Sequence, residues 1–163
     1  MQKNYFIYEK SEFNVTINKV PIWFKEVEVT GDENKGTIKF HSHNNYDEIW
    51  GPNATMEFDW LKKDRTKFLH SREVQESIDM YNAINVVVTK KEQVWLHTHE
   101  FTYWSGGRSK MIRKRYYPEN NLHGVLYCEL TERQFNMHSV IIREHYEGFK
   151  PYILESFMSI ICH

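Results

Sequence analysis

Residues 93–104, QVWLHTHEFTYW, carry the strongest β-strand pattern in the chain. Because side chains along a strand alternate between two faces, one continuous strand here gathers its rings on one side. An aromatic wall of this kind suits a flat, conjugated ligand, although rings also fill cores or form outward ladders. We expect this ring-bearing face to line a ligand cavity. Its members are Trp95, His97, His99, Phe101 and Tyr103.

Alternating apolar and polar residues continue on both sides of this segment. From residue 83 onward the predicted strands follow one another as a meander separated by short turn signals, which is typical of an up-and-down sheet that closes on itself. We therefore predict an all-β fold, an antiparallel up-and-down β-barrel of about 8–10 strands with one or two short helices. The remaining predicted strands are 12–20, 23–30, 36–43, 54–62, 83–89, 109–117, 122–130, 134–145 and 156–162.

One helix is expected at 71–81, beside or inside the barrel. Ser71 can serve as its N-cap, and Glu73 and Glu76 lie near its start, where acidic side chains interact favourably with the helix dipole.

Composition favours one domain over 1–163, because 163 residues without a linker or an internal repeat suit a single core. The formal net charge of −1 argues against an electrostatic nucleic-acid binder. No apolar run is long enough to span a membrane. The first residues, MQKNYFIYEKSEF, lack the basic-then-apolar order of a signal peptide, so we expect a cytoplasmic protein.

Two cysteines, Cys128 and Cys162, are too few for a disulfide framework. Both lie within apolar predicted strands. We expect them to stay reduced as small buried side chains and not to be needed for ligand capture.

Two His-x-His pairs, His41/His43 and His97/His99, have a spacing that some metal sites use on strands. Glu100 follows His99 on the opposite strand face, which is wrong for a shared ion, and only His138 offers a later imidazole. We therefore expect no metal site and no change in stability on chelation.

A basic stretch includes Arg113 and Arg115, which share a predicted strand face. Paired guanidinium groups suit a ligand carboxylate or propionate. The alternatives are a solvated outer face or, with Tyr116 and Tyr117 beside them, a surface for single-stranded RNA that the neutral net charge disfavours.

The segment VLYCELTERQFNMHSVIIREHYEGF (125–149), followed by SFMSIIC (156–162), resembles the closing strands of the S-type phycobiliprotein bilin lyases. Corresponding positions are Tyr127, Ser139, Gly148-Phe149 and Ser156-Phe157. The stretch ATMEFD (54–59) is similar to a Gly-Thr-Met-Glu-Trp-Asp strand of that family. Two arginines of the family fall on Phe135 and Met137 here.

This resemblance implies a calycin-like (lipocalin-like) barrel that binds a linear tetrapyrrole, a bilin, and transfers it to a cysteine of a phycobiliprotein subunit. The bilin would be the substrate or ligand, and no other cofactor is expected. Glu57 and Glu129 would be the catalytic acids. Arg113, Arg115 and Arg143 would hold the propionates, with Ser139 nearby.

Two other functions remain open at this stage. One is a carrier of a fatty acid or another small apolar ligand that performs no reaction. The other is a barrel-shaped interaction protein whose interior is filled by its own aromatic side chains.

Overall fold

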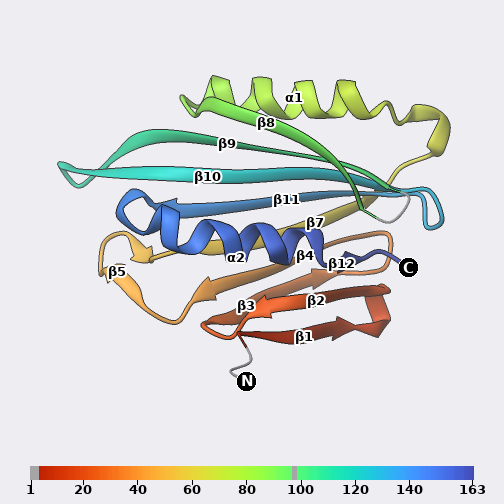
Figure 1. Cartoon of the computed structure of the whole chain (residues 1–163), viewed down its shortest axis with the longest axis horizontal. Coiled ribbons are helices and arrows are strands. Elements are labelled where there is room, and N and C mark those ends of the chain that lie inside the picture. Colours follow the sequence, from red (N-terminus) through yellow and green to blue (C-terminus); the bar gives the residue numbers. More distant parts are fainter. Residues whose placement is uncertain (1–3, 97–98) are drawn as a thin grey trace.

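The computed structural model describes residues 4–96 and 99–163, with the side chain of Lys90 excepted. Its largest part is an open antiparallel sheet, whose strands run roughly parallel to the long axis of the molecule in Figure 1. In spatial order the strands are β3 (Phe24–Gly31), β4 (Lys35–Ser42), β7 (Thr55–Lys62), β11 (Arg133–Ile142), β10 (Arg115–Cys128), β9 (His99–Ile112) and β8 (Val87–Leu96).

The predicted closed barrel is wrong. Strands β8 to β11 do form the expected meander, but β3 and β8 stand at opposite ends of the sheet order and do not pair with each other. Other strands that a closed barrel would need form two separate small sheets instead. One contains β1 (Tyr5–Lys10), β2 (Val15–Pro21) and β12 (Ile160–Ile161), and the other contains β5 (Asn45–Asp47) and β6 (Gly51–Pro52).

Most buried apolar side chains of the large sheet belong to one face. Helix α2 (Tyr146–Met158) and the three-stranded sheet cover this face (Figure 1). Phe58, Phe101 and Phe135 from the sheet are fully buried there with Phe157 of the helix. The interior is thus a packed core, and its rings fill space that a barrel would leave to a ligand.

Helix α1 (His70–Ala83) covers part of the opposite face, over β8, β9 and β10. Val74 and Ile78 recur at a spacing of four and pack against Trp104 and Val125, so the predicted helix is confirmed. It begins before Ser71, however, and Leu69 at the N-cap makes no side-chain capping bond.

Helix α2 was not predicted, because Gly148 and Pro151 interrupt it in the sequence. Tyr146, Ile153 and Phe157 are nevertheless buried at helical spacing. The strand predicted at 156–162 includes the last residues of this helix, and the observed strand there is only β12, Ile160–Ile161.

Short 3₁₀ turns occupy Ser11–Phe13, Arg65–Lys67 and Arg143–His145. Within the described ranges, no helix is both long and apolar enough to cross a membrane.

Two tight hairpins replace the predicted breaks in the meander. The segment 93–104 is not one strand, because β8 ends at Leu96 and β9 begins at His99. The chain turns again at Arg113 and Lys114, whose φ angles are +49° and +66°. Most such two-residue turns use Asn or Gly, so this pair gave no turn signal. The sequences Ser105-Gly106-Gly107 and Pro118-Glu119-Asn120-Asn121, which are among the turn signals on which the meander was predicted, lie inside β9 and β10.

Candidate functional site

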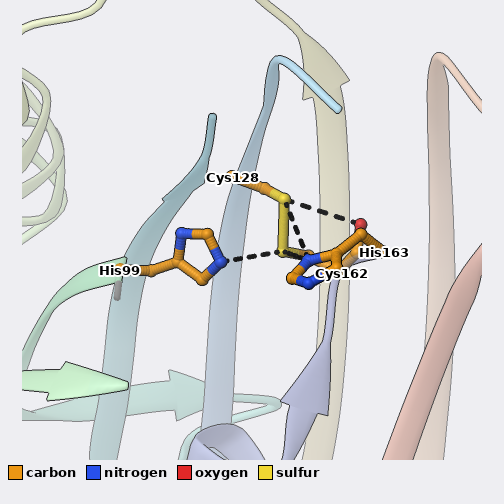
Figure 2. A group of neighbouring side chains, drawn as sticks. All are labelled: His99, Cys128, Cys162 and His163. Atoms are coloured by element: carbon orange, nitrogen blue, oxygen red, sulfur yellow. Dashed lines mark hydrogen bonds between the residues drawn. A yellow bond between two sulfur atoms is a disulfide. The ribbon is translucent and has the colours of Figure 1, made fainter. Parts of the chain in front are cut away.

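Four sulfur- and nitrogen-bearing side chains meet where three chain segments converge. His99 starts β9, Cys128 ends β10, and Cys162 and His163 follow β12 (Figure 2). One potential ligand atom from each lies within 4.8 Å of every other. We refer to these four residues as the Cys–His centre.

The spacing between nitrogen and sulfur atoms can be compared with that of a zinc ion. The distance to Cys162 Sγ is 3.6 Å from His99 Nε2 and 3.4 Å from His163 Nδ1, and His163 Nδ1 lies 3.7 Å from Cys128 Sγ. Zinc binds sulfur at about 2.3 Å and nitrogen at about 2.0 Å, so two such ligands of one tetrahedral ion lie about 3.5 Å apart. These three nitrogen–sulfur distances suit ligands of one tetrahedral ion, although the two sulfur atoms are bonded to each other in this structure and would have to separate for such an ion to bind.

The second ring nitrogen of His99 has a carboxylate partner. His99 Nδ1 lies 2.7 Å from Glu129 Oε2 and can donate its proton there, which leaves Nε2 unprotonated and facing the sulfurs. Carboxylates commonly orient metal-binding histidines in this way. His99, Cys128 and Cys162 are buried, and His163 is exposed, so the centre is closed on its inner side and reachable from solvent.

The structure joins Cys128 and Cys162 in a disulfide between Cα atoms 6.2 Å apart. The prediction that both thiols stay reduced is therefore wrong for this form of the protein. The thiols of Cys128 and Cys162 were expected to be inert because each cysteine lies in an apolar predicted strand. The two cysteines are 34 residues apart, and nothing in their local sequence shows that β10 and β12 bring them together.

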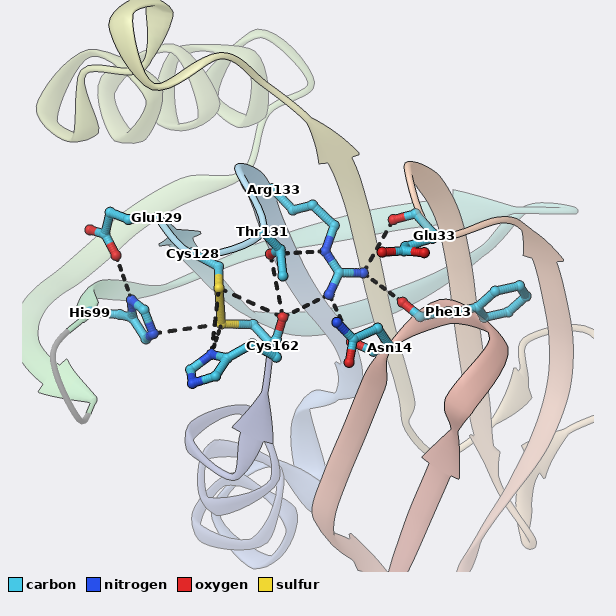
Figure 3. Close-up of a disulfide and its surroundings, with 10 residues drawn as sticks. Phe13, Asn14, Glu33, His99, Cys128, Glu129, Thr131, Arg133 and Cys162 are labelled. Atoms are coloured by element: carbon cyan, nitrogen blue, oxygen red, sulfur yellow. Dashed lines mark hydrogen bonds and ion pairs between the residues drawn. A yellow bond between two sulfur atoms is a disulfide. The ribbon is translucent and has the colours of Figure 1, made fainter.

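A buried arginine holds the backbone beside the disulfide (Figure 3). Arg133 donates to the carbonyl oxygens of Phe13, Asn14 and Cys162 at 2.6–2.7 Å. It also donates to the carbonyl oxygen of Glu33 at 3.2 Å and to the Thr131 hydroxyl at 3.1 Å. One side chain thus links four segments around the Cys–His centre.

Of the predicted acids, only Glu129 contacts this centre, through His99. Glu57 lies on the other face of the large sheet, in β7, where its Oε2 is 3.1 Å from His138 Nδ1. Asp59 is beside it, and burial raises the pKa of that carboxyl to about 6, with the neighbouring Glu57 adding to the shift. Desolvation also lowers the pKa of His138.

The predicted ring-bearing face does not form one wall. Trp95 is 67 % exposed and pairs with Glu100 across the hairpin, so it lies on the face opposite to Phe101. Phe101 is fully buried in the core and stacks on Tyr103, whose hydroxyl donates to Glu92. The prediction for His97 lies outside the described residues.

The predicted propionate-binding residues do not converge on one another either. Arg113 forms the β9–β10 turn, and Arg115 lies 3.4 Å from Asp47. Arg143 donates to the side-chain oxygen of Asn120 at 2.9 Å. The Ser139 hydroxyl is buried and donates to the carbonyl oxygen of Thr55 at 2.5 Å.

Known proteins resemble this chain in fold only. No family model matches the sequence, and no curated protein matches it. Among solved structures, the chain is similar to cyanobacterial PsbP (CyanoP) from Synechocystis, with a TM-score of 0.64 and 9% identity over 100% of this chain and 95% of that one. It is also similar to the Ran-binding protein Mog1p of Saccharomyces cerevisiae, with a TM-score of 0.60 and 13% identity over 99% and 96% of the two chains.

These likenesses correct the resemblance to the bilin lyases. The open α/β architecture of the PsbP and Mog1p type extends over the full chain, and it is not a calycin barrel. The predicted bilin binding and transfer, and the alternatives of a barrel carrier or a barrel-shaped interaction protein, all depended on that barrel. Identity of 9–13% shows a shared fold and assigns no activity.

Proposed function

We propose that this protein is a zinc-binding protein whose Cys–His centre holds one Zn²⁺ when its two thiols are reduced. The observation that carries the proposal is the set of nitrogen–sulfur distances, 3.4–3.7 Å, which one tetrahedral ion can bridge. The earlier expectation of no metal site considered only the two His-x-His pairs and not this set of ligands.

The chemistry of the four ligands favours zinc among the common metals. Two thiolates and two imidazoles are the ligand types of many structural zinc sites. All four positions are taken by protein, so no position is left for a substrate or water. A closed site of this kind stabilises a fold or responds to redox state rather than catalysing a reaction.

Zinc binding and the disulfide are then two alternative ways of linking Cys128 and Cys162. A phosphine reductant with one water converts the disulfide to two thiols and leaves as the phosphine oxide. Zinc binding displaces the two thiol protons. By the chain-entropy relation, a disulfide that closes a loop of this length is worth about 4 kcal/mol, and the ion takes over the role of fastening residues 160–163 to β9 and β10.

A zinc titration of the protein in both redox states tests this proposal. We expect the phosphine-reduced, chelator-treated protein to bind one Zn²⁺ per chain and the disulfide form to bind none at this centre. Cobalt in place of zinc should give the visible absorption of a tetrahedral ion with thiolate ligands. At zinc concentrations about 100 times Kd, the free energy of unfolding should rise by about 2.7 kcal/mol.

His99→Gln and His41→Gln form a matched pair for the titration. His41 belongs to the other His-x-His pair and lies in β4, outside the centre. His99→Gln should weaken zinc binding at least about tenfold, and His41→Gln should leave it unchanged. Equal affinity of the two variants, or no stoichiometric uptake by the reduced protein, would refute the proposal.

A further inference from the structure

A second group of polar residues lies on the face of the large sheet opposite to the core. Glu57, Asp59 and His138 each offer a ligand atom within 4.8 Å of the other two. We call these three residues the carboxylate–histidine cluster. It is built on the neighbouring strands β7 and β11, where Glu57 and His138 are direct cross-strand partners.

Strand register places the cluster in a row of polar and aromatic side chains. Lys39 of β4 pairs with Glu57, Glu57 with His138, His138 with His123 of β10, and His123 with Trp104 of β9. Within this row, only Lys39 carries a positive charge at neutral pH with His138 unprotonated. Asp59, two residues along β7 from Glu57, adds a second carboxylate beside the row. Two carboxylates thus face one lysine, and the balance leaves room for a cation.

A cavity of about 220 Å³ opens beside the cluster, beneath helix α1. Asp59 and His138 line it together with His123, and Tyr81 of the helix covers His123 with a ring-centroid distance of 3.7 Å. The cavity lies on the opposite face from the packed core.

His123 gives independent evidence that this cavity holds a ligand. It is 2 % exposed, and neither of its ring nitrogens has a hydrogen-bond partner within the described part of the chain. A buried polar group left unpaired costs about 1–3 kcal/mol, so such groups are usually satisfied by water or a ligand. Its ring stacks 6.1 Å from that of His138, next to the cluster.

We propose that the carboxylate–histidine cluster binds a divalent first-row metal ion, with coordination positions left open toward the cavity and His123. Oxygen-rich sites with one imidazole suit Mn²⁺, Fe²⁺ or Zn²⁺. Three protein ligands leave at least one position for water or a small anion, as in catalytic rather than structural metal sites. His123 is placed to form a hydrogen bond with such an additional ligand. This site is separate from the Cys–His centre.

Mn²⁺ is the probe for this site, and the disulfide form is the protein to use. The disulfide removes both thiolates from the Cys–His centre, so Mn²⁺ uptake does not depend on the zinc proposal. We expect one equivalent of Mn²⁺ to bind, as measured by the loss of the free-ion electron paramagnetic resonance signal. Relaxation of the ring protons of His138 and His123 should increase far more than that of His99.

Asp59→Asn and Glu9→Gln remove the same charge at two places. Asp59→Asn keeps an acceptor for the Thr37 hydroxyl, which donates to Asp59 at 2.6 Å, and Glu9 is exposed in β1. The first variant should weaken Mn²⁺ binding about tenfold or more, and the second should not change it.

His138→Gln provides a second ligand variant if Asp59→Asn does not fold. Absence of saturable binding at one equivalent, wild-type affinity in a folded Asp59→Asn variant, or relaxation effects no larger at His138 than at His99 would each overturn the proposal. The relaxation measurement needs no variant, so it decides the matter even if both variants unfold.

Discussion

Replacing Arg133 with methionine should destabilise the protein more than any other single change of a charged side chain around the Cys–His centre. Arg133 is 1 % exposed and forms no close ion pair in the described chain; burial lowers its pKa, and the nearby Glu33 carboxylate offsets this only in part. Its guanidinium is stabilised mainly by dipoles, chiefly the four carbonyl oxygens of Phe13, Asn14, Glu33 and Cys162. Methionine has a similar length and removes these four hydrogen bonds and the one to the Thr131 hydroxyl.

The size of the effect follows from two opposing terms. Hydrogen bonds from a charged donor contribute about 1.5 kcal/mol or more each, so the four carbonyl bonds sum to about 6 kcal/mol. Removing a buried charge returns a desolvation penalty of several kcal/mol. We expect a net loss of about 3 kcal/mol, which is a large part of the 5–15 kcal/mol that typically stabilises a domain.

Urea unfolding followed by circular dichroism measures this loss, with Arg113→Met as the control. Arg113 is exposed and lies in the β9–β10 turn, where its φ angle is positive. Its substitution should change the free energy of unfolding by less than about 0.5 kcal/mol. If Arg133→Met unfolds at the same urea concentration as the control, the carbonyl network does not stabilise the protein and the reasoning fails.

Three further predictions concern the large sheet. Phe101→Ala should cost about 3–5 kcal/mol because its ring is fully buried, and Trp95→Ala should cost little because its side chain is 67 % exposed, as thermal unfolding of both variants will show. Gly124→Ala should destabilise by about 1–3 kcal/mol in the same assay, because a Cβ atom there would lie 2.6 Å from the Phe101 ring. Burial lowers the pKa of His123 to about 2, below its unfolded value near 6.5, so its contribution to stability is complete above pH 6.5 and falls by about 1.4 kcal/mol per pH unit below it. His123→Phe should remove this contribution and make unfolding less sensitive to pH between 6.5 and 5, and an unchanged pH dependence would show that His123 is protonated in the fold.

Local patterns in the sequence predicted individual elements better than their arrangement. Period-2 alternation identified much of β2, β4, β7 and β11, and helical spacing identified α1. Closure into a barrel was inferred from the meander alone, but whether a sheet closes depends on pairing between its two end strands. Those strands, β3 and β8, are far apart in the sequence, and no local signal reports whether they meet.

The hairpin at residues 93–104 shows how one missed turn changes a functional prediction. No glycine or asparagine separates Leu96, where β8 ends, from His99, where β9 begins, so two paired strands were interpreted as one strand. Each such error exchanges the faces of the residues beyond it. Trp95 and Phe101 were placed on one wall for this reason, although the structure puts them on opposite faces.

Site residues were predicted only in part, because the ligands come from distant segments. His99 and Glu129 were both identified, but as ligand-binding residue and catalytic acid of a cavity rather than as a hydrogen-bonded pair. Cys128 and Cys162 were set aside because their apolar neighbours suggested inert thiols. Besides the His97/His99 pair, the adjacent pair Cys162-His163 was a local signal for a metal centre, since two metal-binding residue types stand side by side there.

The contacts of Cys162 determine how the Cys–His centre can change state. Its sulfur belongs to the disulfide, but its carbonyl oxygen accepts hydrogen bonds from Arg133 at 2.7 Å and from Thr131 at 3.3 Å. These backbone contacts do not involve the sulfur, so we expect them to remain when the disulfide is reduced. The Cys162 thiol and its neighbour His163 therefore stay close to His99 and Cys128 after reduction. Exchange between the disulfide and the proposed zinc ion would then need only small movements of the side chains, so we expect the same fold in both states.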